Sequence, residues 1–320
     1  MDSNKAKRSF RFDIELVRIF YAAEQKNRSF FERTGNKKNR ANRLRFLLYN
    51  GIHIIIKSTV NFLQADNLPV CKREIFMKVT LEDIRQKPMP KHIAVIMDGN
   101  GRWAKSRGLI RTAGHRMGVQ ALKSLVLALD ELDIHYVTVY AFSTENWKRP
   151  ADEVNTLMDL IVEFLDKELD YMHEKGVRIH PIGDISRLTG KTYDKITAAA
   201  ELTKQNTNIV LNVALNYGGR QEIVHAAKAI CEDVQNGRLT VDDIDEALFG
   251  SYLYTAGQPD PDLLIRPSGE MRVSNFLLWQ IAYSEFWCTN ILWPDFGKEH
   301  LWQAIWEYQN RDRRFGGLGK

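Results

Sequence analysis

The sequence predicts an α/β fold with a mainly parallel central sheet flanked by helices. From about Lys91 onward, short apolar runs alternate with longer amphipathic stretches, the pattern of strands joined by crossover helices. Polar segments follow several of these runs, at the strand ends where open α/β sheets bind ligands. The predicted strands are Ile93–Met97, Tyr136–Ala141, Val177–Ile182, Ile209–Leu215 and Leu263–Ile265.

The clearest predicted helix follows Pro150. Its apolar residues, from Val154 to Met172, fall on one face, and Asp152 and Glu153 occupy the first turn, where the helix dipole favours negative charge. Such a stripe is typical of core packing. A second interpretation, that part of the stripe lines an apolar tunnel, stays open.

Basic residues are unevenly distributed along the 320 residues. Residues 1–76 hold 16 Lys and Arg against 7 Asp and Glu, a net charge of +9, whereas residues 77–320 hold 29 against 33, a net charge of −4. No nucleic-acid partner is therefore expected, because it would require a basic face on the folded domain. We divide the chain into a basic N-terminal extension, 1–76, and one larger domain, 77–320.

Three interpretations of the extension remain open: a disordered basic segment, a peripheral membrane anchor with Phe46–Ile56 as its apolar part, or translated sequence ahead of a start at Met77. The chain shows no secretory signal. No apolar run reaches the roughly 20 residues needed to cross a bilayer. With three widely spaced cysteines, which suit a reducing compartment, we expect a cytoplasmic protein and leave peripheral membrane contact open.

The first chemical cluster begins at Asp98, after the first predicted strand. Gly99 and Gly101 allow backbone amides to approach a diphosphate closely. The spacing Gly99-x-Gly101-x-x-Ala104 also matches a dinucleotide-binding fingerprint, so an NAD-binding oxidoreductase is an alternative. Asp98 favours Mg²⁺ with a diphosphate, because a carboxylate at an anion site requires a bridging cation. Simple helix capping by Asp98 is the structural alternative.

Two further clusters follow later strands. The polar loop Phe142–Arg149 comes after the second strand, and Arg266, Arg272 and Ser274 come after the fifth. Guanidinium groups match phosphate oxygens, so the later loop predicts a second anion site and hence two diphosphate substrates. Glu285 lies in an apolar segment and is expected either to bind metal or to pair with an arginine of the preceding loop.

Together these motifs resemble the cis-prenyltransferase family, whose bacterial members are the undecaprenyl diphosphate synthases. The match extends from about His92 to Gly317 through H-I-A-V-I-M-D-G-N-G-R-W-A, Y-A-F-S-T-E-N-W-x-R-P, N-Y-G-G-R, I-R-P-S-G-E-x-R-x-S-N-F and R-R-F-G-G. The resemblance implies a Mg²⁺-dependent homodimer that condenses isopentenyl diphosphate with an allylic diphosphate in an apolar tunnel. The departures are Pro267-Ser268 and the extension, which compact bacterial members lack.

The resemblance also implies roles for individual residues. Asp98 is the expected catalytic residue and magnesium ligand, Glu285 the second magnesium-associated acid, and Asn146 the acceptor of the departing proton. The residues expected to hold the allylic diphosphate are Gly99, Asn100, Gly101, Arg102, Trp103, Arg111 and His115. Those expected from the substrate loop are Ser143, Thr144, Glu145, Trp147 and Arg149. Those expected at the isopentenyl diphosphate site are Arg266, Arg272, Val273 and Ser274, with Arg314 and Gly316 reaching into the neighbouring subunit's site.

The expected primer is farnesyl diphosphate and the favoured product undecaprenyl diphosphate, with a longer, dolichyl-type product as the alternative. A trans-prenyltransferase would require two D-D-x-x-D clusters, which the sequence lacks. A non-catalytic partner subunit of the same family is expected to lack Asp98 or Asn146, and both are present.

Overall fold

The computed structural model describes residues 79–188 and 190–311, all within the unit Pro69–Lys320. At its centre is a six-stranded parallel sheet with the order β3-β4-β2-β1-β5-β6. The strands are β1 His92–Ile96, β2 Tyr136–Ser143, β3 Val177–Ile182, β4 Ile209–Tyr217, β5 Leu263–Arg266 and β6 Glu285–Cys288. The predicted fold class is confirmed, and β6 is the strand that the sequence pattern missed. The basic extension and its boundary at Met77 lie outside the described residues.

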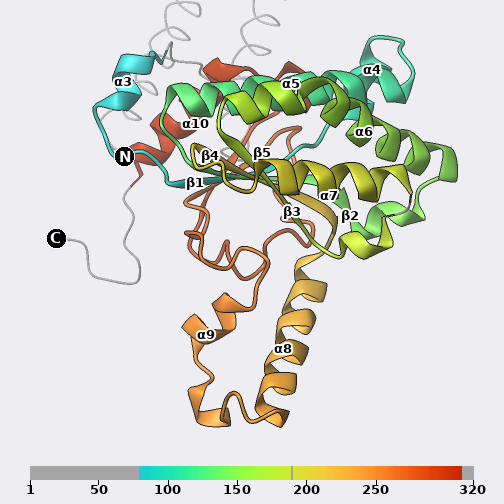
Figure 1. Ribbon diagram of the computed structural model, residues 1–320. Helices are drawn as coiled ribbons and strands as arrows, with labels where there is room; N and C mark the ends of the chain where they lie inside the picture. Colours follow the sequence, from blue (N-terminus) through green and yellow to red (C-terminus); the bar gives the residue numbers. More distant parts are fainter. Residues whose placement is uncertain (1–78, 189, 312–320) are drawn as a thin grey trace, which may run out of the picture. The chain divides into compact units, whose positions relative to one another are not determined.

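Helices cover one face of this sheet, and a helical arm projects from the other (Figure 1). The covering helices are α5 Arg111–Glu131, α6 Ala151–Glu174, α7 Lys191–Thr203 and α10 Lys298–Gln309, with the short α3 Leu81–Arg85 and α4 Asn100–Ser106 beside them. The arm consists of α8 Gly219–Gln235 and α9 Glu246–Ser251. Helix α6 begins directly after Pro150, as predicted. Within the described ranges, no helix is long and apolar enough to span a bilayer.

Side chains alternate between the two faces of the sheet, as the period of a strand requires. Ile93 and Val95 of β1 pack with Val139 of β2 and with the covering helices in the larger core cluster. Ala94 and Ile96 point to the opposite face, where a smaller cluster is closed by loop residues that include Phe276. Strands β1 and β2 are therefore buried on both faces of the sheet, which explains why their sequences are nearly continuously apolar.

A buried polar network crosses the arm-side face of the sheet through four adjacent strands. The Nδ1–H of His92 donates to the Pro259 carbonyl at 2.7 Å, so its Nε2 accepts from the Thr138 hydroxyl at 2.8 Å. Asn212 donates to Thr138 at 2.9 Å and lies 2.8 Å from the Nδ1 of His180. Burial lowers the pKa of His92 to about 4, although the Pro259 carbonyl and a nearby carboxylate act to raise it.

The pKa of His92 predicts a pH-dependent stability. As the pH falls from 6.5 to 4, the unfolded chain binds a proton at His92 that the folded chain does not, so the free energy of unfolding falls. One such proton corresponds to at most about 1.4 kcal/mol per pH unit. In urea titrations, His92→Gln should lower stability at pH 7 but should show a shallower loss between pH 7 and 5 than the unaltered protein. Parallel losses in the two proteins would contradict a neutral, buried His92.

Candidate active site

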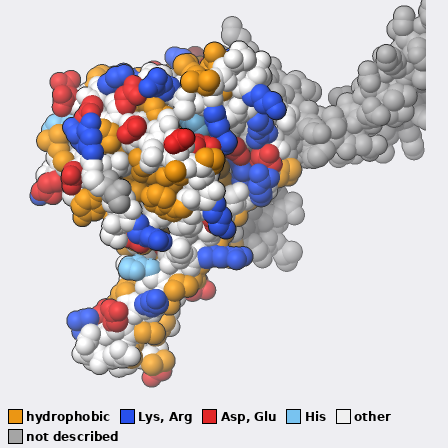
Figure 2. Space-filling view, turned by 90° about the vertical axis from the view of Figure 1, so that its right-hand side faces the viewer, with side chains coloured by type: hydrophobic (Ala, Val, Ile, Leu, Met, Phe, Trp, Pro, Cys, Tyr) orange, Lys and Arg blue, Asp and Glu red, His pale blue; other side chains and the backbone are white. Residues whose placement is uncertain are grey.

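A cavity of about 600 Å³ opens at the carboxyl-terminal ends of the strands and extends between the sheet and helices α5 and α6. Its mouth is lined by polar residues, namely Asp98, Asn100, His115, Ser143, Glu145, Asn146, Arg149, Arg266, Ser274 and Asn275. Its interior is apolar and includes Leu157, Leu160, Ile161, Phe164 and Leu165 of α6. Part of the α6 stripe therefore lines a cavity, while other residues such as Val154 and Met172 pack in the core. The space-filling view from the side on which α4 lies shows hydrophobic side chains gathered among charged ones (Figure 2).

Asp98 and Arg266 form the central ion pair of the mouth. The Arg266 side chain is only 5% exposed, and its Nη2 donates to the Asp98 carboxylate at 2.9 Å. Its Nη1 donates to the Ser274 hydroxyl at 2.9 Å and to the Arg272 carbonyl. Burial acts to raise the pKa of Asp98, but the hydrogen bond and charge of Arg266, with the charge of Arg102, hold this pKa below its usual range. Asp98 is therefore ionised at neutral pH.

Gly99 turns the chain from Asp98 into α4. It has a left-handed φ of 106° and is the N-cap of this helix, so the capping alternative for Asp98 is wrong. Arg102, in the first turn, donates to both the carbonyl and the hydroxyl of Ser268, at 2.8 and 2.6 Å, and lies 3.7 Å from Asp98. The loops after β1 and β5 are thus joined directly at the mouth.

A second charged group lies where α5 and α6 begin. Glu153 pairs with Arg149 at 2.7 Å and with Arg111 at 3.1 Å, and its side chain is largely buried. Burial, with the charges of Arg149 and Arg111, lowers the pKa of the neighbouring His115 to about 4, although Glu153 opposes this shift. Neutral His115 presents a buried Nε2 that has no protein partner in the described ranges. The sequence places Glu153 in the first turn of a helix, but only the folded chain brings it between two arginines.

The polar loop Ser143–Arg149, called the substrate loop because the resemblance predicts that it binds substrate, forms a 3-10 turn, Thr144–Lys148, directly after β2. Asn146 caps this turn, because its Oδ1 accepts from the Ser143 N–H at 3.1 Å. The Trp147 indole donates to Asn216 at 2.7 Å and is 38% exposed, so it is held at the surface rather than in the core. These bonds fix the loop at the cavity mouth without filling it.

Several of the predicted site residues do not line this cavity. The Trp103 indole donates to Asp295 at 2.6 Å and packs beneath Arg107, and exposed Arg272 pairs with Glu270. Gly99, Gly101, Arg102, Arg111, Thr144, Trp147 and Val273 lie around the lining residues rather than among them. Arg314 and Gly316 lie outside the described residues.

Glu285 lies apart from Asp98 in the fold. It begins β6 in register with Leu263, which pairs with Ile93 at the start of β1, whereas Asp98 follows the other end of β1. Its carboxylate pairs with Arg311 at 2.6 Å. Glu285 therefore forms a salt bridge, but with Arg311 and not with an arginine of the preceding loop as expected. A metal role for Glu285 stays a prediction.

Comparisons with known proteins agree with this arrangement. A family model described as "Putative undecaprenyl diphosphate synthase" matches residues 96–316. The chain belongs to the cis-prenyltransferase family. An isoprenyl transferase of Clostridium perfringens is 62% identical over 230 residues, which cover 72% of this chain and 91% of that protein. An isoprenyl transferase of Bacillus subtilis is 53% identical over 241 residues, with 75% and 93% covered.

Solved structures give the same result. Lavandulyl diphosphate synthase from Lavandula x intermedia, in complex with dimethylallyl diphosphate, has a TM-score of 0.69 and 40% identity, covering 71% of this chain and 98% of that one. A probable undecaprenyl diphosphate synthase from Campylobacter jejuni has a TM-score of 0.60 and 36% identity, covering 72% and 99%. The protein is an enzyme that transfers prenyl groups, and this membership displaces the oxidoreductase alternative.

Two glycines of α5 let this prenyltransferase place Asn100 at the mouth. A Cβ at Gly114 would lie 2.0 Å from the Asn100 carbonyl oxygen, and one at Gly118 would lie 2.4 Å from the Asn100 Oδ1. The Trp293 indole donates to the Gly118 carbonyl at 2.8 Å and would lie 3.0 Å from a Cβ at Gly118. No side chain fits at either position while α4 keeps its place.

We expect Gly118→Ala to displace Asn100 and the start of α4, because its methyl group meets both Asn100 and Trp293. Overpacking of this kind costs about 1–3 kcal/mol of stability, and prenyl transfer should fall further than stability alone explains. Gly250→Ala in α9 is the matched control, since a Cβ there meets nothing within 4 Å. Initial rates and urea midpoints of both variants test this, and an unchanged rate in Gly118→Ala would contradict it.

Proposed function

We propose that this prenyltransferase condenses isopentenyl diphosphate with an allylic diphosphate, farnesyl diphosphate, to make a long cis-polyprenyl diphosphate of undecaprenyl length. The observation that carries the proposal is the division of one cavity into a charged mouth and an apolar interior. Diphosphates suit the guanidinium groups at the mouth, and a growing hydrocarbon chain suits the interior. A chain held in this way lies with its reactive end at Asp98 and its tail between α5 and α6.

Magnesium is part of the proposal, and the donor chemistry fits it. In the described ranges, no group of three or more His, Cys, Asp or Glu side chains is placed to hold a metal. Mg²⁺ in phosphate-handling enzymes, however, is usually held by one or two carboxylates together with substrate phosphates. Ionised Asp98, at the cavity mouth, is the residue that would hold it. A bound Mg²⁺ would supply charge stabilisation to the departing diphosphate.

The chain's own residues would then bind, orient and exclude water. Arg266 and Arg149 at the mouth, with Arg102 and Arg111 behind them, supply positive charge where negative charge develops on the leaving group. Neutral His115 can donate to a phosphate oxygen from Nε2 in the tautomer that carries its proton there. Apolar walls keep water from the allylic carbon, and the proton released from the isopentenyl unit is assigned to Asn146.

A homodimer belongs to the same proposal, because Arg314 and Gly316 are expected to act in the partner's site. Peripheral membrane contact during product release follows from the apolar product. Sedimentation of the full chain would report the first of these, and flotation with lipid vesicles the second.

Asp98→Asn should abolish most activity and should also lower the free energy of unfolding, because buried Arg266 loses its anionic partner. The amide retains an oxygen that can accept from Arg266 but loses the charge needed to hold a cation, so kcat should fall by roughly 10²–10³-fold. Asp152→Asn, an exposed acid in the first turn of α6, is the control and should keep full activity. Near-normal turnover of Asp98→Asn in saturating Mg²⁺ would remove Asp98 from the mechanism.

The product assay tests the whole proposal. With farnesyl diphosphate, radiolabelled isopentenyl diphosphate and Mg²⁺, chromatography of the dephosphorylated products should show a ladder that ends at the undecaprenyl chain. EDTA should stop the reaction and excess Mg²⁺ should restore it. A ladder that ends at a longer chain would support the dolichyl-type alternative, and a full rate in EDTA would contradict the magnesium assignment.

A further inference from the structure

A strained turn at residues 274–277 follows Arg272 and contacts the start of α8. Ser274, Asn275 and Leu277 have positive φ values of 49°, 64° and 45°. Residues other than glycine rarely adopt this conformation, and where they do the strain is offset by surrounding contacts and often marks a functional site. Asn tolerates it best among such residues. The turn therefore has a conformation that its neighbours must hold in place.

Asn275 makes three hydrogen bonds to two separate parts of the chain. Its carbonyl oxygen accepts from the Gly219 N–H at 2.7 Å, and its Oδ1 accepts from the Arg220 N–H at 2.9 Å, so it satisfies the first amides of α8. Its Nδ2 donates to the Glu145 carboxylate of the substrate loop at 3.0 Å. A Cβ at Gly218 would lie 2.7 Å from this Nδ2, so the approach of α8 depends on glycine there.

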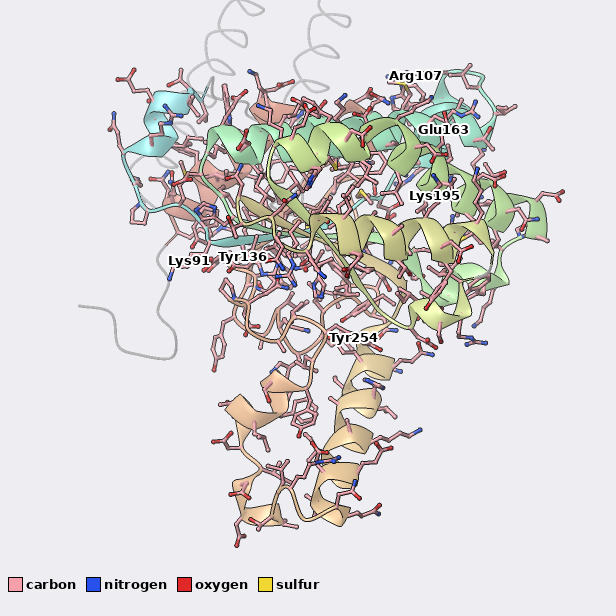
Figure 3. The ribbon with its side chains drawn as sticks, viewed as in Figure 1. Lys91, Arg107, Tyr136, Glu163, Lys195 and Tyr254 are labelled. Atoms are coloured by element: carbon pink, nitrogen blue, oxygen red, sulfur yellow. The ribbon has the colours of Figure 1, made fainter. Side chains whose placement is uncertain are left out.

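The turn is anchored on both sides of Asn275. Ser274, its neighbour, accepts from Arg266, and Phe276 is fully buried and stacks on Tyr140 with ring centroids 4.6 Å apart. The base of the arm also packs here, because Tyr254, labelled in Figure 3, lies beneath the sheet next to α8 and meets Tyr217 edge-on. Asn275 is thus fixed from below and has its amide group directed at the mouth.

We propose that Asn275 is a positioning residue whose side-chain amide ties Glu145 of the substrate loop to the start of α8 and thereby fixes the substrate loop against the Arg266–Ser274 loop. The inference rests on the proposed function, in which both loops line the mouth of the cavity that holds the two diphosphates. Reaction between two bound substrates depends on their relative placement. The Asn275 amide accepts from Arg220 and donates to Glu145 at once, which neither an ionised carboxylate nor an aliphatic side chain can do.

Asn275→Asp is the discriminating variant. It keeps an acceptor for Arg220 and a residue type that tolerates positive φ, but it places a second carboxylate against Glu145. Hydrogen exchange at the backbone amides of residues 144–149 should accelerate about fivefold, the effect of one lost hydrogen bond. Turnover of isopentenyl diphosphate should fall roughly tenfold, mainly in kcat rather than KM, as expected for lost positioning. The urea midpoint should change little.

The rescue is Glu145→Gln in the Asn275→Asp background, where the new amide again donates to a carboxylate. Exchange in residues 144–149 should return towards that of the unaltered protein, so the two substitutions should not be additive. Asn236→Asp, exposed at the far end of α8, is the matched control and should alter neither readout. Unchanged exchange in Asn275→Asp, or additive effects in the double variant, would show that Asn275 serves only its own turn. Because exchange is measured without substrate, lack of polyprenyl product from the unaltered enzyme would overturn the proposed function alone.

Discussion

The structure of the site depends on one constraint, the buried charge of Arg266. A guanidinium that is almost fully enclosed needs an anionic partner, because an unpaired buried charge destabilises the fold. Asp98 supplies this partner, and it can do so only because β1 and β5 are neighbours in the sheet. The same ion pair sets the electrostatics of the mouth, since it keeps Asp98 ionised while Arg266 still reaches Ser274.

Local chemistry made much of the fold predictable. Strands buried on both faces read as apolar runs, and α6 begins at Pro150 with acids in its first turn, so five strands and the main helix follow from sequence. The strand β6 was missed because it is short and begins with a charged residue, and only Trp287 of its four residues is buried. Its position beside β5 depends on the sheet, which no local pattern encodes.

The site was less predictable than the fold, because it is made by contacts between distant segments. Motifs identified the segments, but Glu153 bridges two arginines only once α5 and α6 lie together. Trp103 stands in a family motif and Glu285 has a role implied by the resemblance, yet their side chains bond to Asp295 and Arg311. Asn275 was not singled out, since an asparagine in a loop is ordinary until its three partners are known.

The polar network through His92, Thr138, Asn212 and His180 has a consequence for how the enzyme can evolve. It lies on the arm-side face of the sheet, opposite helices α5 and α6 and the apolar cavity that we propose for the growing chain. A longer product would need smaller side chains on α5, α6 or the strand residues that line the cavity. Substitutions in the network are disfavoured, because they would leave its buried partners without hydrogen bonds. If the proposed function holds, a change of product length has to come from residues that line this cavity between the sheet and helices α5 and α6.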